Sequence, residues 1–292
     1  MSPMHGKPQE NGPRPDVAAA ISLLGDSQPT VAHAARLCLQ HAGEAARGDL
    51  ARAAEAGDVP TRLRARALLR ALDVRLLLER FASLDLGRSS RGSATPLLQG
   101  AVLLTHMVRT FAPATSELER RLRRSSTLLR RQFVGRSLPT CARLLSDHLY
   151  HELGYHGGDA SHLELDHVLL DRVLMHKVGV PVTLSLIYLV VARQAGLSVA
   201  GVAMPDHFLV RLHGVRPVLV DPFHGGRTVT KADCGRYLRQ NGHDQVAEHL
   251  RDLSDREVLK HFLGTLRRAA AYRPDAEAQQ SLRSALQHLE AQ

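Results

Sequence analysis

Three features in the second half of the chain have the residue types and order of a nucleophilic site. An apolar helix opens with proline at Pro181, its first helical position, and Gly196 closes it. His207 begins one strand-like segment and Asp221 ends the next. A helix N-terminus lowers the pKa of a thiol, a histidine accepts the thiol proton, and an aspartate orients the histidine. A helix N-terminus, a histidine and an aspartate in this order are the framework of a Cys–His–Asp thiol site.

Two hydroxyl side chains on the same helix are alternatives to a thiol. Ser185 lies one turn after Pro181 on nearly the same face, about 6 Å further along the axis, whereas Thr183 is about 200° round the helix. A buried hydroxyl bonded to the carbonyl one turn back is the commoner role of such a serine. A triad of Ser185, His207 and Asp221 is therefore the alternative chemistry. Thr183 is a weaker nucleophile candidate.

Further polar side chains accompany these residues and are candidates for ligand binding. Asp206 adds a carboxylate next to His207, and strand alternation places Arg211 on the same face as His207. Arg227 follows a loop with two glycines after Asp221, where it either binds an anion or stays solvated.

The segments around these residues resemble a known family. The runs GVPVTLSLIYLVVARQAGL, PDHFLVRL and VLVDPFHGGR are similar to the core of the SirB1-type branch of the transglutaminase-like superfamily. The similarity covers residues 96–268. Active superfamily members open the helix with G-x-C, and a glycine follows that cysteine by about fifteen positions, as Gly196 follows Pro181 here.

The resemblance implies a role for each matching position. It places Pro181 at the catalytic cysteine, His207 at the histidine and Asp221 at the aspartate, within a transglutaminase-like (papain-like) domain. Asp206 stands where the family usually has glycine, and residues 162–167 (HLELDH) replace a segment with aromatic and asparagine residues. The resemblance therefore implies a degenerate member without its nucleophile.

The elements that must position these residues follow from hydrophobic periodicity. Residues 96–111, 116–133 and 138–153 have helical spacing, and 180–195 is a helix apolar on nearly all sides, hence buried. Residues 199–204, 207–212 and 218–220 are short β-branched runs that predict an antiparallel meander packed on that helix. The chain is helical again from Lys231. We therefore expect an α+β fold.

The first part of the chain has a different organisation. Residues 1–15 are polar and predict a disordered tail without the apolar segment of a signal peptide. Residues 16–85 are helical, with two Gly-Asp turns 32 residues apart that resemble HEAT-type repeats; an Ala-rich bundle is equally compatible. Residues 86–95 predict a linker, 96–235 the transglutaminase-like domain, and 236–292 C-terminal helices.

Composition favours a helical, intracellular protein. Tryptophan is absent and aromatic residues make up 4%, so Leu, Val and Ala must form the core. The three cysteines, Cys38, Cys141 and Cys234, are far apart and do not suggest a disulfide framework. No apolar stretch is long enough to span a bilayer. We expect a soluble, cytoplasmic protein that does not act at a membrane.

Two other classes of site are less favoured. His148, His151, Asp166 and His167 could form a zinc set, but no spacing matches a known ligand signature, so we expect neither metal nor cofactor. The net charge is +9, and an arginine run lies in the helix of residues 116–133 and just after it. This run lacks interleaved aromatic residues and suits a solvated face or an acidic partner better than specific nucleic-acid recognition. Its members are Arg120, Arg121, Arg123, Arg124, Arg130, Arg131 and Arg136.

The functional expectation combines the site with the resemblance. We expect a non-catalytic regulatory or interaction protein that binds a protein or peptide partner around His207 and Asp221. The alternative is an acyltransferase or hydrolase acting on amides or esters, with Ser185 or Thr183 as nucleophile.

Overall fold

The computed structural model describes residues 16–86, 95–109, 115–159, 162–272 and 275–291. The chain divides into two compact units, Met1–Leu76 and Leu77–Gln292. The predicted tail and all but the two ends of the predicted linker lie outside the described residues.

The first unit is helical, as expected. It contains α1 (Val17–Leu23), α2 (Pro29–Ala42), α3 (Arg47–Ala56) and the first part of α4 (Val59–Ala82), with a short 3-10 turn at Gly43–Ala46. Its core is built mainly from leucine and alanine, because the sequence offers few aromatic residues. Leu24, Leu39 and Leu50 are fully buried there.

The two Gly-Asp turns of this unit lie next to each other. Asp58 caps α4 by accepting a hydrogen bond from the Thr61 backbone N–H at 2.9 Å. The equivalent Asp26 carboxylate accepts from the Gln28 N–H at 2.7 Å, and the Arg64 guanidinium donates to the Asp26 carbonyl at 3.0 Å. The helices predicted for residues 16–85 are present, whereas a HEAT-type repeat remains a prediction.

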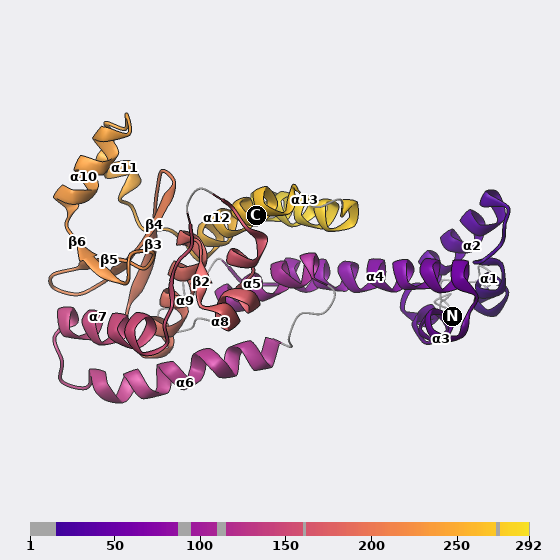
Figure 1. Cartoon of the computed structure of the whole chain (residues 1–292), viewed down its shortest axis with the longest axis horizontal. Coiled ribbons are helices and arrows are strands. Elements are labelled where there is room, and N and C mark those ends of the chain that lie inside the picture. The colour runs from indigo at the N-terminus through magenta and orange to yellow at the C-terminus, as the bar shows by residue number, and fades with distance from the viewer. Residues whose placement is uncertain (1–15, 87–94, 110–114, 160–161, 273–274, 292) are drawn as a thin grey trace, which may run out of the picture. The chain divides into compact units, whose positions relative to one another are not determined.

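The second unit surrounds a buried central helix, α9 (Pro181–Gln194), with other helices and a sheet (Figure 1). Every residue from Val182 to Arg193 is buried, which fits its apolar sequence. The one buried charge on it, Arg193, pairs with Asp255 at 2.6 Å. The remaining α-helices are α5 (Thr95–Val108), α6 (Thr115–Phe133), α7 (Leu138–Ser146), α8 (Leu170–His176), α10 (Lys231–Gln240), α11 (Val246–His249), α12 (Asp255–Ala270) and α13 (Ala276–Ala291).

One helix is more irregular than its sequence predicts. The segment expected as a single helix over residues 138–153 is α-helical only to Ser146 and continues as a π-helical turn over Asp147–Glu152. Gly154 follows it with a φ of +74°, the left-handed conformation expected of a helix-terminating glycine. Simple apolar spacing does not distinguish an α turn from a π turn, so the sequence did not reveal this change.

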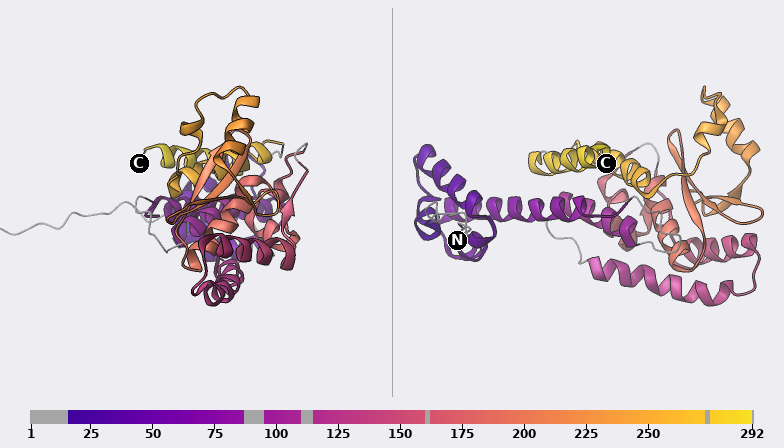
Figure 2. Two further views of the ribbon diagram at one scale, coloured as in Figure 1. Left: turned by 90° about the vertical axis from the view of Figure 1, so that its left-hand side faces the viewer. Right: turned by 180° about the vertical axis from the view of Figure 1, so that it is seen from behind.

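The sheet is an antiparallel meander of four strands in chain order (Figures 1 and 2). The three predicted strands are present as β3 (Val199–Met204), β4 (His207–Leu212) and β5 (Val218–Asp221). A fourth strand, β6 (Arg227–Val229), was missed because it is three residues long and mostly exposed. A small parallel pair, β1 (His156–Gly157) with β2 (Val178–Gly179), was also missed. The predicted α+β class is confirmed.

The two faces of this sheet contact different parts of the unit. Phe208, Val210 and Val220 belong to the main core, which also contains α9. Leu209 and Leu219 belong to a smaller cluster, completed by Cys234 of α10 and by residues of and after α11. Because strand residues alternate between faces, His207 lies on the same face as Leu209.

Among the described helices, none combines the length and the apolar composition that a membrane span requires.

Candidate functional site

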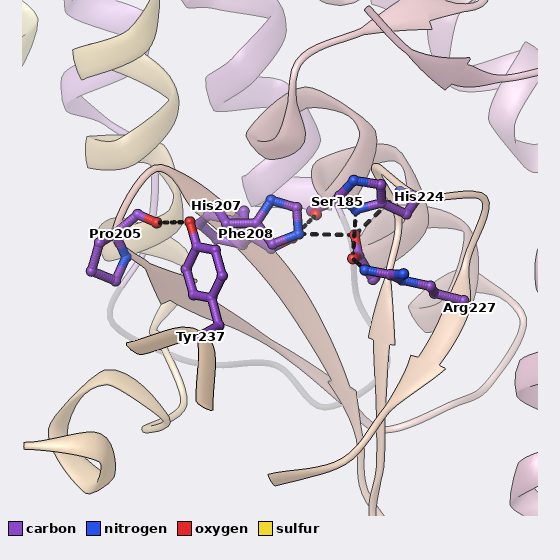
Figure 3. Close-up of polar contacts among 8 residues, drawn as sticks. Ser185, Pro205, His207, Phe208, His224, Arg227 and Tyr237 are labelled. Atoms are coloured by element: carbon purple, nitrogen blue, oxygen red, sulfur yellow. Dashed lines mark hydrogen bonds and ion pairs between the residues drawn. The ribbon is translucent and has the colours of Figure 1, made fainter. Parts of the chain in front are cut away.

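His207 and Asp221 meet across two neighbouring strands. Arg211 pairs with Leu219 in the β4–β5 register, so Leu209 is opposite Asp221 and His207 lies two residues further on the same face. The Nε2 atom of His207 is 2.9 Å from Oδ1 of Asp221 (Figure 3). The Asp221 side chain is almost completely buried, so these partners satisfy a carboxylate that water cannot reach freely.

A second histidine, which the sequence reasoning did not single out, shares the same carboxylate. Nδ1 of His224 lies 2.7 Å from Oδ2 of Asp221, and the His224 backbone N–H donates to Oδ1 at 3.2 Å. The spacing Asp-x-x-His in a glycine-rich turn is the signal that could have revealed this contact, since a carboxylate in a turn reaches residues two or three positions on.

The loop after Asp221 holds His224 close to the strand end. Gly225 and Gly226 both have a φ of +70°, which glycine adopts without strain. The Gly226 N–H donates to the Asp221 carbonyl at 2.9 Å, and the Ser146 hydroxyl donates to the Gly226 carbonyl at 2.8 Å. The turn is thereby fixed against the end of α7.

The electrostatics of the site favour an ionised Asp221. Burial opposes ionisation, but hydrogen bonds and charge from His207 and His224 outweigh it and lower the pKa of Asp221 to about 2. Arg227 adds a positive charge 3.4 Å from Oδ2, with 62% of its side chain exposed. Arg227 thus lies beside Asp221, and its role in binding an anion stays a prediction.

Aromatic rings line the site around His207. The Phe223 ring meets the His207 ring edge-on, with 6.0 Å between ring centroids, and the His224 ring is tilted at 5.3 Å. Tyr237 of α10 lies on another side at 6.5 Å, where its hydroxyl donates to the Pro205 carbonyl at 3.1 Å (Figure 3). Burial, together with the nearby Asp206 carboxylate, raises the pKa of Tyr237.

The two candidate hydroxyl nucleophiles are committed to backbone carbonyls. The Ser185 hydroxyl is fully buried and donates to the Phe208 carbonyl at 3.1 Å. Thr183 is also fully buried and donates to the Val168 carbonyl at 3.0 Å. The acceptor of Ser185 is therefore a strand carbonyl next to His207, not the carbonyl one turn back that a helical serine commonly uses.

The other candidate ligands are less closely associated with His207. Arg211 forms an ion pair with Asp252 and donates to the Leu250 carbonyl at 2.6 Å, so it ties the sheet to the segment before α12. Asp206 occupies the tight β3–β4 turn with a φ of +54°, an uncommon conformation for a residue other than glycine. Both assignments to ligand binding stay predictions.

Both cysteines among the described residues of this unit are buried. Burial raises the pKa of the Cys141 thiol and of the Cys234 thiol, so both resist forming the reactive thiolate. Cys38 belongs to the other unit.

The zinc set considered from the sequence is not assembled around His148. Its Nδ1 lies 2.6 Å from the Glu152 carboxylate and its Nε2 lies 3.0 Å from the Ser125 hydroxyl, so both ring nitrogens have protein partners. Among the described residues, the group whose side chains converge with metal-ligand spacing is instead His207, Asp221 and His224.

Part of the chain is similar in sequence to known proteins. The family model of the transglutaminase-like superfamily matches residues 112–264, which is more than half of the chain. A UPF0162 protein of Xylella fastidiosa strain 9a5c is 32% identical over 126 residues, covering 41% of this chain and 45% of the relative. A UPF0162 protein of Vibrio cholerae is 31% identical over 78 residues, covering 26% of this chain and 29% of the relative.

A third relative comes from a different kind of protein. Human F-box only protein 21 is 27% identical over 127 residues, covering 40% of this chain and 20% of the relative. The similarity thus spans less than half the length of each of these relatives. No solved structure matches the chain. With the family match over residues 112–264 and the His207–Asp221 pair in place, the chain belongs to the transglutaminase-like superfamily.

Proposed function

We propose that the transglutaminase-like domain is a non-catalytic module that binds a polypeptide segment beside His207 and Asp221. The observation that carries the proposal is the state of the residues at the start of α9. Pro181 stands at the first residue of α9, and the hydroxyls of Thr183 and Ser185 are buried and bonded to backbone carbonyls. A nucleophilic hydroxyl must instead contact a base and reach its substrate.

The surroundings of the pair supply groups that suit a peptide. His224 and Arg227 are at least half exposed and can donate hydrogen bonds to peptide carbonyls or carboxylates. Tyr237 is partly exposed beside them and offers an aromatic face with a polar tip, a combination enriched at protein interfaces.

The matched segment also occurs as part of a longer protein. In human F-box only protein 21, the matched segment takes up 20% of the chain, so the same unit occurs within a much longer protein. Because function depends on the site and not on the fold, the binding role is tested at the residues around His207.

A peptide-array screen with the purified full chain tests the proposal, followed by fluorescence anisotropy on the peptides it selects. We expect Tyr237→Ala to weaken binding by about tenfold or more, since losing an interface aromatic commonly costs over 1 kcal/mol. Tyr272→Ala is the matched control, because Tyr272 is strongly exposed at the end of α12. Equal effects of the two substitutions on peptide affinity would show that the peptide does not bind beside His207.

The enzyme alternative is tested on the same protein. Amide and ester substrates are incubated with the wild type and with the variants Ser185→Ala and His207→Ala. We expect no turnover above that of buffer. Turnover that disappears in both variants would replace the binding module with a hydrolase or acyltransferase.

A further inference from the structure

We propose that His207, Asp221 and His224 form a binding site for one divalent transition-metal ion such as Zn²⁺. Two imidazoles and one carboxylate are a ligand set that zinc and related ions accept, with further positions left for water or a bound group. The site does not depend on the peptide-binding proposal, because the ion would be held by this chain alone.

The ligand atoms already converge. One nitrogen from each histidine and one oxygen of Asp221 all lie within 4.8 Å of one another. Ligands about 2.1 Å from a tetrahedral ion are about 3.4 Å apart, so modest rotations of three side chains would suffice. Each histidine already contacts this carboxylate, His207 at 2.9 Å from Oδ1 and His224 at 2.7 Å from Oδ2.

The backbone fixes these ligands before any ion arrives. His207 is held by its pairing with Met204 of β3 and Asp221 by its pairing with Arg227 of β6. His224 is held by the turn whose Gly226 N–H donates to the Asp221 carbonyl. The three residues therefore come from a strand start, a strand end and a tight turn. A site on such rigid elements loses little conformational entropy when it binds an ion.

The site is also reachable and partly shielded. Half of the His224 side chain is exposed, which gives a cation access from solvent, whereas His207 is largely buried and Asp221 almost completely so. The Phe223 ring packs edge-on against both imidazoles, at 6.0 Å and 5.1 Å between centroids. An apolar wall of this kind limits water around a bound ion.

Arg227 opposes the ion and provides a second, independent test. Its guanidinium lies 3.4 Å from Oδ2 of Asp221, so it occupies part of the space and repels a cation. Its side chain is mostly exposed and can turn toward solvent. A metal site therefore predicts that removing this charge tightens binding, whereas a merely structural His–Asp–His cluster predicts no such gain.

The experiment is a titration of the full chain with Zn²⁺ alone, after dialysis against a chelator, by calorimetry and by competition with a chromophoric chelator. We expect one equivalent bound at this site, with affinity reduced about tenfold or more in His224→Ala. Arg227→Gln should increase the affinity. Visible absorption of the Co²⁺ complex should show a tetrahedral ion in the wild type and lose intensity in His224→Ala.

The control separates the site from adventitious binding by other histidines. His243 and His249 stack at 4.9 Å between centroids and form an alternative imidazole pair, so His243→Ala must leave the affinity unchanged. Equal Zn²⁺ affinity in the wild type and His224→Ala would overturn the proposal, as would loss of binding in His243→Ala instead. Circular dichroism checks that each variant is folded. If His224→Ala does not fold, His224→Gln replaces it in the titration. Because no peptide is present, this result is independent of the peptide screen.

Discussion

The Nε2 atom of His207 lies 2.9 Å from Oδ1 of Asp221, although the two residues are 14 positions apart in the chain. The β4–β5 pairing, which reaches Val210 and Val220, brings the start of β4 close to the end of β5. In a thiol enzyme such a pair orients the base that activates the nucleophile. Here the pair persists beside a helix that begins with proline, and Asp221 holds a second histidine as well.

Replacing the shared carboxylate should destabilise the domain. Asp221→Asn keeps the shape but removes the charge that accepts from both histidines, so we expect the free energy of unfolding to fall by about 1–3 kcal/mol. Urea denaturation measures the change. Asp244→Asn, at an exposed position, is the control and should have little effect. An unchanged midpoint in Asp221→Asn would show that the cluster contributes nothing to stability.

Restoring a thiol at the helix start tests the assignment of Pro181. In Pro181→Cys we expect the new thiol to react with iodoacetamide at neutral pH faster than the buried Cys141 and Cys234, because a helix N-terminus favours the thiolate. Adding His207→Ala should slow the reaction by about tenfold or more, since a neighbouring base raises reactivity. Mass spectrometry of the labelled peptides follows each site.

The matched control for that experiment is the preceding residue. Val180 is half-buried and lies just before α9, so Val180→Cys offers a thiol of similar exposure outside the first helical position. If it reacts as fast as Pro181→Cys and responds equally to His207→Ala, Pro181 is not the cysteine position.

The hydroxyl of Thr183 should contribute to the stability of the fold and not to any catalysis. Thr183→Val keeps the branched shape but leaves the Val168 carbonyl without its 3.0 Å hydrogen bond, so we expect a loss of about 1 kcal/mol. Ser185→Ala should cost a similar amount through the Phe208 carbonyl. Thermal or urea unfolding measures both, and a loss of any enzymatic turnover in either variant would contradict a purely structural role.

The two glycines of the Asp221 loop should respond differently to alanine. Both have a φ of +70°, and Gly225 has open space where a Cβ would lie, so Gly225→Ala should cost about 1 kcal/mol from backbone strain alone. A Cβ on Gly226 would lie 2.3 Å from the Ser146 hydroxyl and 2.6 Å from the Tyr150 ring, which adds a clash of about 1–3 kcal/mol. Equal costs in urea unfolding would show that the loop relaxes freely.

Acid should weaken the start of α12 over a defined range of pH. Hydrogen bonding from Arg251 at 2.5 Å and from the Ser254 capping position lowers the pKa of Glu257 from its ordinary value of 4.5 to about 2. A lowered folded-state pKa contributes stability that is complete above the unfolded-state pKa and is lost as the pH falls from about 4.5 to 2. The stability advantage over Glu257→Gln should therefore shrink in this range.

Urea unfolding of both proteins at a series of pH values measures this difference. Glu290→Gln, at an exposed position on α13, is the control and should show no such trend. A constant difference between the wild type and Glu257→Gln down to about pH 2 would mean that the cap does not depend on the carboxylate charge.

Much of the fold was accessible from the chain itself. Apolar content on all sides of residues 180–195 indicated the buried helix, and the β-branched runs around His207 and before Asp221 indicated three antiparallel strands. These predictions succeeded because periodicity and propensity act locally and agree with the final packing. The resemblance of the same segments identified the superfamily, whereas the assignment of Pro181 to its cysteine position stays a prediction.

Only the tertiary structure decided how the polar groups are shared. The sequence suggested that Ser185 faces the same side as Pro181, but the strand that packs on α9 supplies the carbonyl of Phe208 as its acceptor. The sequence alone did not single out His224 as a site residue. Its contact with Asp221 requires a glycine turn, and its relation to His207 requires the pairing of two strands. Residue types set which chemistry is available to this protein, whereas long-range packing determines which atoms meet, because hydrogen bonds and ligand sets depend on separations of a few ångströms.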